Sequence, residues 1–137
     1  MDRRTEPHVY VIDRGDATGP FTVWDPYLDA VWPPLLGSSA LAAIRAVTLA
    51  ITHLGAASTV EITQLAALVG VAPTRFVAAI GRAEEQQLAY VNGTQLSIPR
   101  RLHGPKASVM AELPLPSRTA AIDRLVRFAE GRLADDL

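Results

Sequence analysis

Apolar residues recur at intervals of three and four through the middle of the chain. One continuous stripe predicts an amphipathic helix that is capped by Ser38 or Ser39 and ends near Gly55. This stripe consists of Leu41, Ile44, Val47, Thr48 and Ile51. Shorter repeats predict a second helix over 64–69 and a third helix with Pro73 in its first turn. We therefore expect three successive helices after residue 38.

Short runs of β-branched and aromatic residues, and one alternating run, predict strands outside these helices. Residues 8–12 (HVYVI) and 21–24 (FTVW) are β-branched and aromatic, and the turn-forming run between them suggests that the two strands pair. Residues 59–62 (TVEI) also alternate and directly precede Thr63, the expected N-cap of the second helix. Known folds with a strand at this place pair it with a hairpin farther along the chain, and we expect the same here.

That hairpin is predicted around Asn92 and Gly93. Residues 88–91 and 94–98 have strand-forming patterns, and an Asn-Gly pair between such runs is the strongest short-range signal for a two-residue turn of type I′. This turn needs a positive φ angle at both central residues, which asparagine and glycine tolerate. The sequence thus predicts a β-hairpin soon after the third helix.

The first 37 residues are distinguished by their aromatic side chains. Asp25 and Pro26 suit the N-cap and first position of a short helix that runs through Trp32, where two prolines are expected to stop it. Five of the eight aromatic residues lie in this segment: Tyr10, Phe21, Trp24, Tyr27 and Trp32. We interpret residues 1–37 as an aromatic-rich arm joined to the helical domain.

A second apolar stripe lies near the end of the chain. Ser117 is the expected N-cap of a helix that runs to about Ala134, and ELPLP (112–116) before it is predicted to be an extended linker. The stripe is formed by Ile122, Leu125, Val126, Ala129 and Leu133. Two interpretations are open: the stripe mediates dimerisation, or it packs on the first long helix of its own chain.

Length and composition restrict the class of protein. With 137 residues, 49% of them hydrophobic, the chain is predicted to form one globular domain with a terminal appendage. It has no run of about 20 apolar residues and no apolar region behind its first basic residues, so we expect a cytoplasmic protein. The absence of cysteine excludes disulfides and cysteine nucleophiles. Abundant arginine and alanine are typical of a GC-rich genome, such as that of an actinobacterium.

The most specific signal lies between the second and third predicted helices. Gly70 can take the positive φ angle that ends a helix, and Val71 can fill the angle between the two helices. Ala66 stands four residues before this glycine and Val69 directly before it, and apolar residues follow six, nine and ten positions later: Phe76, Ala79 and Ile80. With these spacings the chain resembles the winged helix-turn-helix superfamily of bacterial regulators over about residues 38–102.

The segment after the third helix extends this resemblance. EEQQL (84–88) is similar to the EE-x-G-L stretch that precedes the hairpin in many such regulators, with Gln87 where glycine is common. The resemblance implies an α+β, mainly α fold, with an arm over 1–37, a winged helix-turn-helix domain over 38–106, and a linker with a C-terminal helix over 107–137. It also implies that the third helix enters the major groove of DNA while the hairpin, or wing, contacts the backbone.

Few residues are available for such contacts. With its apolar side turned inward, the third helix presents Thr74, Arg75, Ala78 and Arg82. Arginine suits the guanine edge, whereas threonine and alanine allow contact with a phosphate or a thymine methyl group. After the hairpin, three further residues are candidates for phosphate contacts: Arg100, Arg101 and Lys106. The alternative for each basic residue is a solvated surface side chain.

The charge distribution has the polarity that DNA binding requires, although it is weak. The whole chain has a net charge of −1, but residues 59–106 carry five basic residues against three acidic ones. Residues 1–58 and 107–137 carry net charges of −2 and −1. The positive segment coincides with the predicted winged domain.

These observations define the expected function. No phosphate-binding, nucleophile or metalloprotease motif is present, and the three histidines are far apart in sequence, so we expect no enzyme, no metal site and no cofactor or small-molecule ligand. We interpret the chain as a nucleoid-associated, homodimeric transcriptional regulator that binds double-stranded DNA. The alternative is a winged-helix module that binds another protein, or an accessory factor in replication or recombination.

Overall fold

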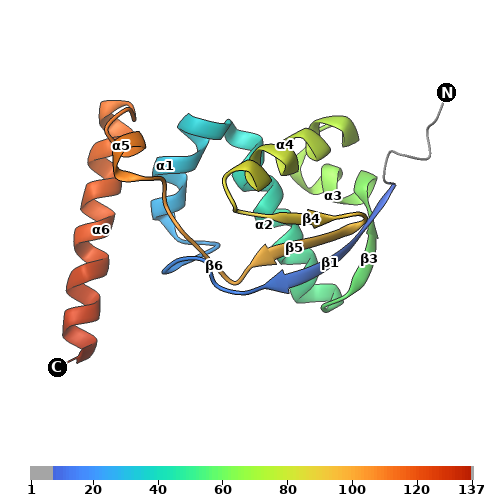
Figure 1. Cartoon of the computed structure of the whole chain (residues 1–137), viewed down its shortest axis with the longest axis horizontal. Coiled ribbons are helices and arrows are strands. Elements are labelled where there is room, and N and C mark those ends of the chain that lie inside the picture. Colours follow the sequence, from blue (N-terminus) through green and yellow to red (C-terminus); the bar gives the residue numbers. More distant parts are fainter. Residues whose placement is uncertain (1–7, 137) are drawn as a thin grey trace.

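The computed structural model describes the backbone of residues 8–136 and the side chains of residues 8–131. Within this part of the chain, six helices accompany a mixed four-stranded sheet and a separate two-stranded sheet. In Figure 1 the last helix stands at one end of the molecule and the four-stranded sheet extends toward the other. The predicted α+β, mainly helical class is therefore confirmed.

The larger sheet is built around the strand nearest the N-terminus. β1 (Val9–Gly15) pairs antiparallel with β3 (Ser58–Glu61) and parallel with β5 (Gln95–Pro99), and β4 (Tyr90–Asn92) pairs antiparallel with β5. The strand order is β3-β1-β5-β4. The predicted pairing of residues 59–62 with the hairpin is wrong, because β1 lies between them.

β1 contributes directly to the hydrophobic core. Tyr10 and Ile12 are buried in the same cluster as Leu96 and Ile98 of β5. Burial raises the pKa of the Tyr10 hydroxyl, and the charge of Glu84 acts in the same direction. The segment that we interpreted as an arm thus supplies a central strand and part of the core.

A small sheet joins the N-terminal segment to the residues after the hairpin. β2 (Phe21–Thr22) pairs antiparallel with β6 (Arg101–Leu102). The prediction that residues 21–24 pair with residues 8–12 is therefore wrong. β2 finds its partner in a strand that the hydrophobic pattern does not reveal, since β6 has only two residues.

Close backbone contacts hold residues 18–19, which lead into β2, against residues 101–103. The backbone N–H and the hydroxyl of Thr18 both donate to the carbonyl of Arg101, at 2.9 and 3.1 Å. Gly19 passes so near the other segment that a Cβ on it would lie 2.5 Å from both His103 Cα and the Leu102 carbonyl oxygen. Position 19 therefore requires glycine.

The first helix begins as the sequence predicts but ends later. α1 (Pro26–Leu36) is capped by Asp25, whose carboxylate accepts the Tyr27 N–H at 2.9 Å. It does not stop at its two prolines, because the Gly37 N–H closes the last turn on the carbonyl of Pro33 at 2.8 Å. The leucines that follow the prolines also pack against the core, which holds this turn in place.

Three helices form the body of the molecule beside the sheet. α2 (Ser38–Leu54) packs against α1, against α3 (Ile62–Val69) and against α4 (Pro73–Glu85). Within residues 8–136, no single helix is both long and apolar enough to cross a membrane. α3 and α4 reach that length and apolarity only together, as a pair bent by 83°.

The N-caps of these helices differ from those that the sequence predicts. α2 follows Gly37 as its N-cap, so both serines lie inside the helix. α3 begins directly after its N-cap Glu61 instead of after Thr63, and the Ile62 N–H donates to the carbonyl of His8 at 2.9 Å. The chain therefore passes from β3 into α3 without a separate capping residue.

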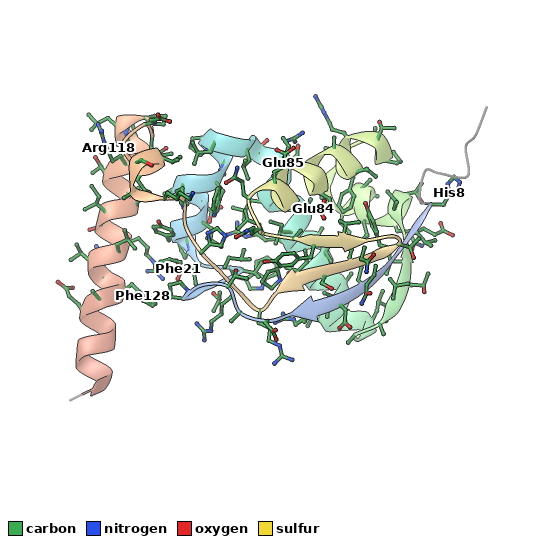
Figure 2. The ribbon with its side chains drawn as sticks, viewed as in Figure 1. His8, Phe21, Glu84, Glu85, Arg118 and Phe128 are labelled. Carbon is green, nitrogen blue, oxygen red and sulfur yellow. The ribbon has the colours of Figure 1, made fainter. Side chains whose placement is uncertain are left out.

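The chain continues into a short helix, α5 (Ala107–Met110), and a long one, α6 (Leu115–Asp136). α6 begins before Ser117, so part of the predicted linker forms its first turn and Ser117 is not its N-cap. α6 packs against α1. Figure 2 shows Phe128 of α6 facing Phe21, with ring centroids 5.2 Å apart.

An ion pair also fastens α6 to the body. Arg124 Nε lies 3.1 Å from Asp25 Oδ1, so Asp25 both caps α1 and binds α6. The hydrogen bond and charge of Asp25 raise the pKa of the Arg124 guanidinium. Together with Phe128, this contact explains why α6 lies along α1 instead of along α2.

Candidate nucleic-acid interface

α3 and α4 meet across a turn of three residues. Gly70 has φ 82° and ψ 31°, the left-handed conformation predicted for it, and its N–H donates to the carbonyl of Ala66 at 2.9 Å. Val71 is partly buried against the core, also as predicted. Ala72 then acts as the N-cap of α4, and Pro73 occupies the first turn.

The two sides of α4 have different environments. The inward side is buried and consists of Phe76, Ala79, Ile80 and Ala83, which confirms the predicted apolar positions. The outward side exposes Thr74, Arg75 and Ala78. The Arg75 side chain makes no hydrogen bond or ion pair within the described residues, so its guanidinium is available to a ligand.

Arg82, the other predicted contact on this helix, has a partner within the chain. Its Nε donates to the carbonyl of Leu36 at 3.0 Å, and the side chain is half-buried. The bond ties the last turns of α4 to the end of α1. Arg82 is thus half-buried and bonded within the chain, whereas Arg75 is exposed, although both lie on α4.

The hairpin forms, but its turn is displaced by one residue. Asn92 pairs with Gln95, so the two-residue loop consists of Gly93 and Thr94 instead of Asn92 and Gly93. Only Gly93, with φ 63°, has a positive φ angle in this loop. This pattern is typical of a type II′ turn, and the predicted type I′ turn is wrong because β-branched Thr94 keeps a negative φ angle.

Two residues position the hairpin relative to α4. The Glu84 carboxylate accepts the Val91 N–H at 2.9 Å, which links the end of α4 to β4. Gln87 has φ 61°, a left-handed conformation that glycine adopts more readily than other residues. The tip itself is polar and uncharged.

The basic residues after the hairpin lie at its other end. Arg100 follows the last residue of β5, whereas the turn lies before its first residue. Arg101 belongs to β6, and its Nη1 donates to the carbonyl of Pro20 at 3.0 Å. Lys106 is exposed and precedes α5, beside a cavity of about 660 Å³ that Trp32 and Val109 also line. The structure does not bring these residues together with Arg75.

Two residues that the sequence interpretation missed complete the surroundings of Arg100 and Arg101. Arg14 and Trp24 line the same hollow, which has a volume of about 340 Å³. Arg14 lies near the end of β1, next to the end of β5, because the two strands run parallel. No sequence signal predicts this meeting, since the strand pairing itself is not predictable from the local pattern.

The predicted dimerisation stripe divides between two sides of α6. Leu125 is half-buried and packs against the core, whereas Ile122, Val126 and Ala129 are exposed. Leu133 lies outside the described side chains. Leu115, which the sequence interpretation did not include, is 64% exposed. The exposed members lie seven, four and three residues apart: Leu115, Ile122, Val126 and Ala129.

A separate apolar surface lies where α2 meets α3. Leu54 and Leu68 are 60% and 56% exposed, and together with Leu49 they line a hollow of about 440 Å³.

Within residues 8–136, no group of three histidine and acidic residues could hold a metal ion. No protein-family model matches this chain, and no curated protein or solved structure is significantly similar to it.

Proposed function

We propose that this chain binds double-stranded DNA as a winged helix-turn-helix protein, with α4 in the major groove. The observation that carries the proposal is the outward side of α4, where Thr74, Arg75 and Ala78 are exposed on a helix whose other side is buried. Small side chains let the helix approach the base edges, and an unpaired arginine can bind guanine in a bidentate manner.

The surroundings of α4 support this proposal. The 83° bend and the three-residue turn that contains Gly70 are close to the geometry of helix-turn-helix motifs. No side chain caps the N-terminus of α4, so its positive dipole end can face a phosphate. In Figure 1 this end of α4 and the turn of the β4–β5 hairpin both point away from α6.

The proposal includes a homodimer formed through the outward side of α6. The spacing of Leu115, Ile122, Val126 and Ala129 follows the alternation of three and four residues that joins two helices in a coiled coil. A second copy of α6 would present a matching seam. Twofold symmetry would then place two copies of α4 on one operator, as in many transcriptional regulators.

Fluorescence anisotropy with labelled duplex DNA tests the role of α4. A lost base contact of Arg75 is worth about 1–3 kcal/mol, so Arg75→Ala should weaken binding roughly 5- to 150-fold. If Arg75 contacts a phosphate instead, the slope of log affinity against log salt should fall by about 0.9. Arg127→Ala is the matched control, since Arg127 is exposed on α6 and, within the described residues, pairs with Asp123 alone. Equal binding by the two variants would contradict the proposal.

Light scattering tests the dimer. The wild type should have about twice the chain mass of 14.7 kDa. Val126→Glu should restore the single-chain mass, because it places a charge in the centre of the seam. Ala120→Glu adds the same charge at an exposed position away from the seam and should leave the dimer intact. A wild-type chain that remains single at high concentration would exclude this interface.

A second candidate function is the binding of another protein. The exposed Leu49, Leu54 and Leu68 favour it, because monomeric proteins rarely expose several large apolar side chains side by side. This candidate predicts that duplex DNA is not retained even at low salt. Retention that depends on Arg75 and persists in Leu68→Ser would exclude it as the sole function.

A further inference from the structure

Three arginines and a tryptophan meet in a hollow away from α4. Arg14 comes from β1, Arg100 and Arg101 follow β5, and Trp24 follows β2. The parallel pairing of β1 with β5 places Gly15 opposite Pro99, which brings the ends of the two strands together. The hollow has a volume of about 340 Å³ and lies at the opposite end of β5 from the hairpin turn.

Most N–H groups of the three arginines in this hollow have no partner within the described residues. All three arginines are exposed, and within the described residues the side chains of Arg14 and Arg100 make no hydrogen bond or ion pair. Arg101 uses Nη1 to donate to the Pro20 carbonyl, which leaves its other N–H groups available. A guanidinium group binds the oxygens of a phosphate in a bidentate manner. The hollow is therefore suited to an anion of this type.

Two acidic residues near the hollow are paired with arginines outside it. Asp25 binds Arg124, and Asp29 binds Arg45 through two bonds of 2.7 and 2.9 Å. The Asp13 carboxylate accepts the backbone N–H of Arg14 at 2.8 Å. The carboxylates of Asp25 and Asp29 are thus paired with arginines outside the hollow.

Trp24 supplies an aromatic surface beside the arginines. Its side chain is 55% exposed, and the Arg45 guanidinium carbon lies 5.8 Å from the centre of its ring. Arg45 is itself fixed, because its Nε donates to the Val23 carbonyl at 3.0 Å and its terminal nitrogens bind Asp29. The indole is therefore held in place while remaining accessible to solvent.

We infer that this hollow binds one nucleotide of a single-stranded nucleic acid, with the phosphate on Arg14 and Arg100 and the base stacked on Trp24. Exposed aromatic rings beside basic side chains are the general means by which proteins bind single strands. A duplex does not offer the face of an internal base, so it does not suit Trp24. A free nucleotide would be poorly enclosed, because small-molecule sites bury most of their ligand, whereas Arg14, Trp24 and Arg100 are all exposed.

Titration of the full chain with a labelled (dT)12 oligonucleotide tests this inference. Binding should quench tryptophan fluorescence, and the signal should come from Trp24, since Trp32 is only 1% exposed and donates to the His103 carbonyl. Trp24→Leu should remove the quench and weaken binding at least about fivefold. Arg14→Ser with Arg100→Ser should lower the salt slope by about 1.4, if each arginine neutralises one phosphate of the strand.

The controls separate this inference from the proposed function. Arg127→Ser should bind (dT)12 as the wild type does, and Arg75→Ala should lose affinity for the duplex but not for (dT)12. A variant that loses only duplex binding therefore reports on the proposed role of α4. A variant that loses only (dT)12 binding reports on the proposed role of the hollow. A (rU)12 arm that matches (dT)12 would show that the sugar is not read, which agrees with contacts to phosphate and base alone.

Three results would overturn the inference. The first is unchanged (dT)12 affinity in the Arg14 and Arg100 double variant, and the second is a quench that survives in Trp24→Leu. The third is equal affinity for dTMP and for (dT)12, which would identify a free nucleotide as the ligand. Because Arg14, Trp24 and Arg100 are all exposed, each substitution should leave the fold intact, and circular dichroism checks this.

Discussion

The outward side of α4 and the arginine hollow both offer cations to a ligand, but they are assembled differently. On α4, Thr74, Arg75 and Ala78 lie within five consecutive residues of one helix. The hollow combines Arg14, Trp24 and Arg100 from segments that are far apart in the sequence. The α4 surface therefore depends on local structure, whereas the hollow depends on strand pairing between distant parts of the chain.

This difference predicts how each region responds to substitution. Changes within α4 and its two flanking turns should act on the helix, the hairpin and the contact of α4 with the end of α1. Changes where β2 meets β6, or where β1 meets β5, should act on the hollow through the packing of two segments. Four substitutions test this contrast, and their expected effects on stability decrease from the first to the last.

The largest effect is expected for Gly19→Ala, near the hollow. The added Cβ would lie 2.5 Å from His103 Cα, and backbone atoms cannot rotate away. We expect a loss of about 1–3 kcal/mol in the free energy of unfolding, measured with urea. Gly81→Ala in α4 is the control, since no atom lies within 4 Å of its Cβ, and it should gain about 0.5–1 kcal/mol. Similar free energies of unfolding for Gly19→Ala and Gly81→Ala would contradict the expected difference between the two regions.

Arg82→Ala should lower stability by about 1 kcal/mol, because the Leu36 carbonyl loses its donor. Arg75→Ala on the same helix should change stability by less than about 0.5 kcal/mol, since in the described part of the chain its side chain makes no hydrogen bond or ion pair. Thermal melts of the two variants measure the difference. If Arg82→Ala keeps full stability but loses duplex DNA, then Arg82 contacts DNA as the sequence suggests.

Gln87→Gly should stabilise the turn that leads into the hairpin. A left-handed residue other than glycine costs about 1–2 kcal/mol, and the greater flexibility of glycine offsets part of this, so the net gain is about 0.5 kcal/mol. Gln86 has φ −100°, so Gln86→Gly should only destabilise. A loss of stability in both variants would show that the strain at Gln87 is relieved by its surroundings.

The smallest effect at neutral pH is expected for Tyr27→Phe. The Tyr27 hydroxyl donates a weak hydrogen bond to Met110 Sδ at 3.7 Å, and burial raises its pKa above the usual value of 10.0. A raised folded-state pKa means that this contribution to stability is complete below pH 10 and disappears as the pH rises through the folded value. Melting temperatures between pH 8 and 11 should therefore fall less steeply in Tyr27→Phe than in the wild type. Equal slopes would show that Tyr27 is not the group that titrates.

The sequence predicts local features of this fold well, because they depend on neighbouring residues. The glycine at position 70, the buried side of α4 and the cap at Asp25 all follow from spacing and side-chain chemistry. Even the unusual residue at position 87 stands out before its φ angle is known. The candidate side of α4 belongs to this class, since one helical period determines which residues face outward.

Features that depend on distant contacts are not predictable in this way. Its β-branched and aromatic residues identify β1 as a strand but do not show that it lies between β3 and β5. Likewise, helical spacing places Arg82 on the outward side of α4 but does not reveal its bond to the Leu36 carbonyl. The apolar residues of α6 appear as one stripe in the sequence, yet contact with α1 divides them, with Leu125 inside and Val126 outside.

The central place of β1 has a consequence for how the chain folds as it is made. Val11 pairs with Gln95, so β1 must wait for 84 further residues, which takes roughly 4–17 s at about 5–20 residues per second. During that time its edge is open to other chains, even after β3 has paired on the other side. Asp13 and Arg14, the charged residues of this strand, protect such an edge from aggregation. Arg14, which lines the hollow, thus also protects the edge of the incomplete sheet from pairing with other chains.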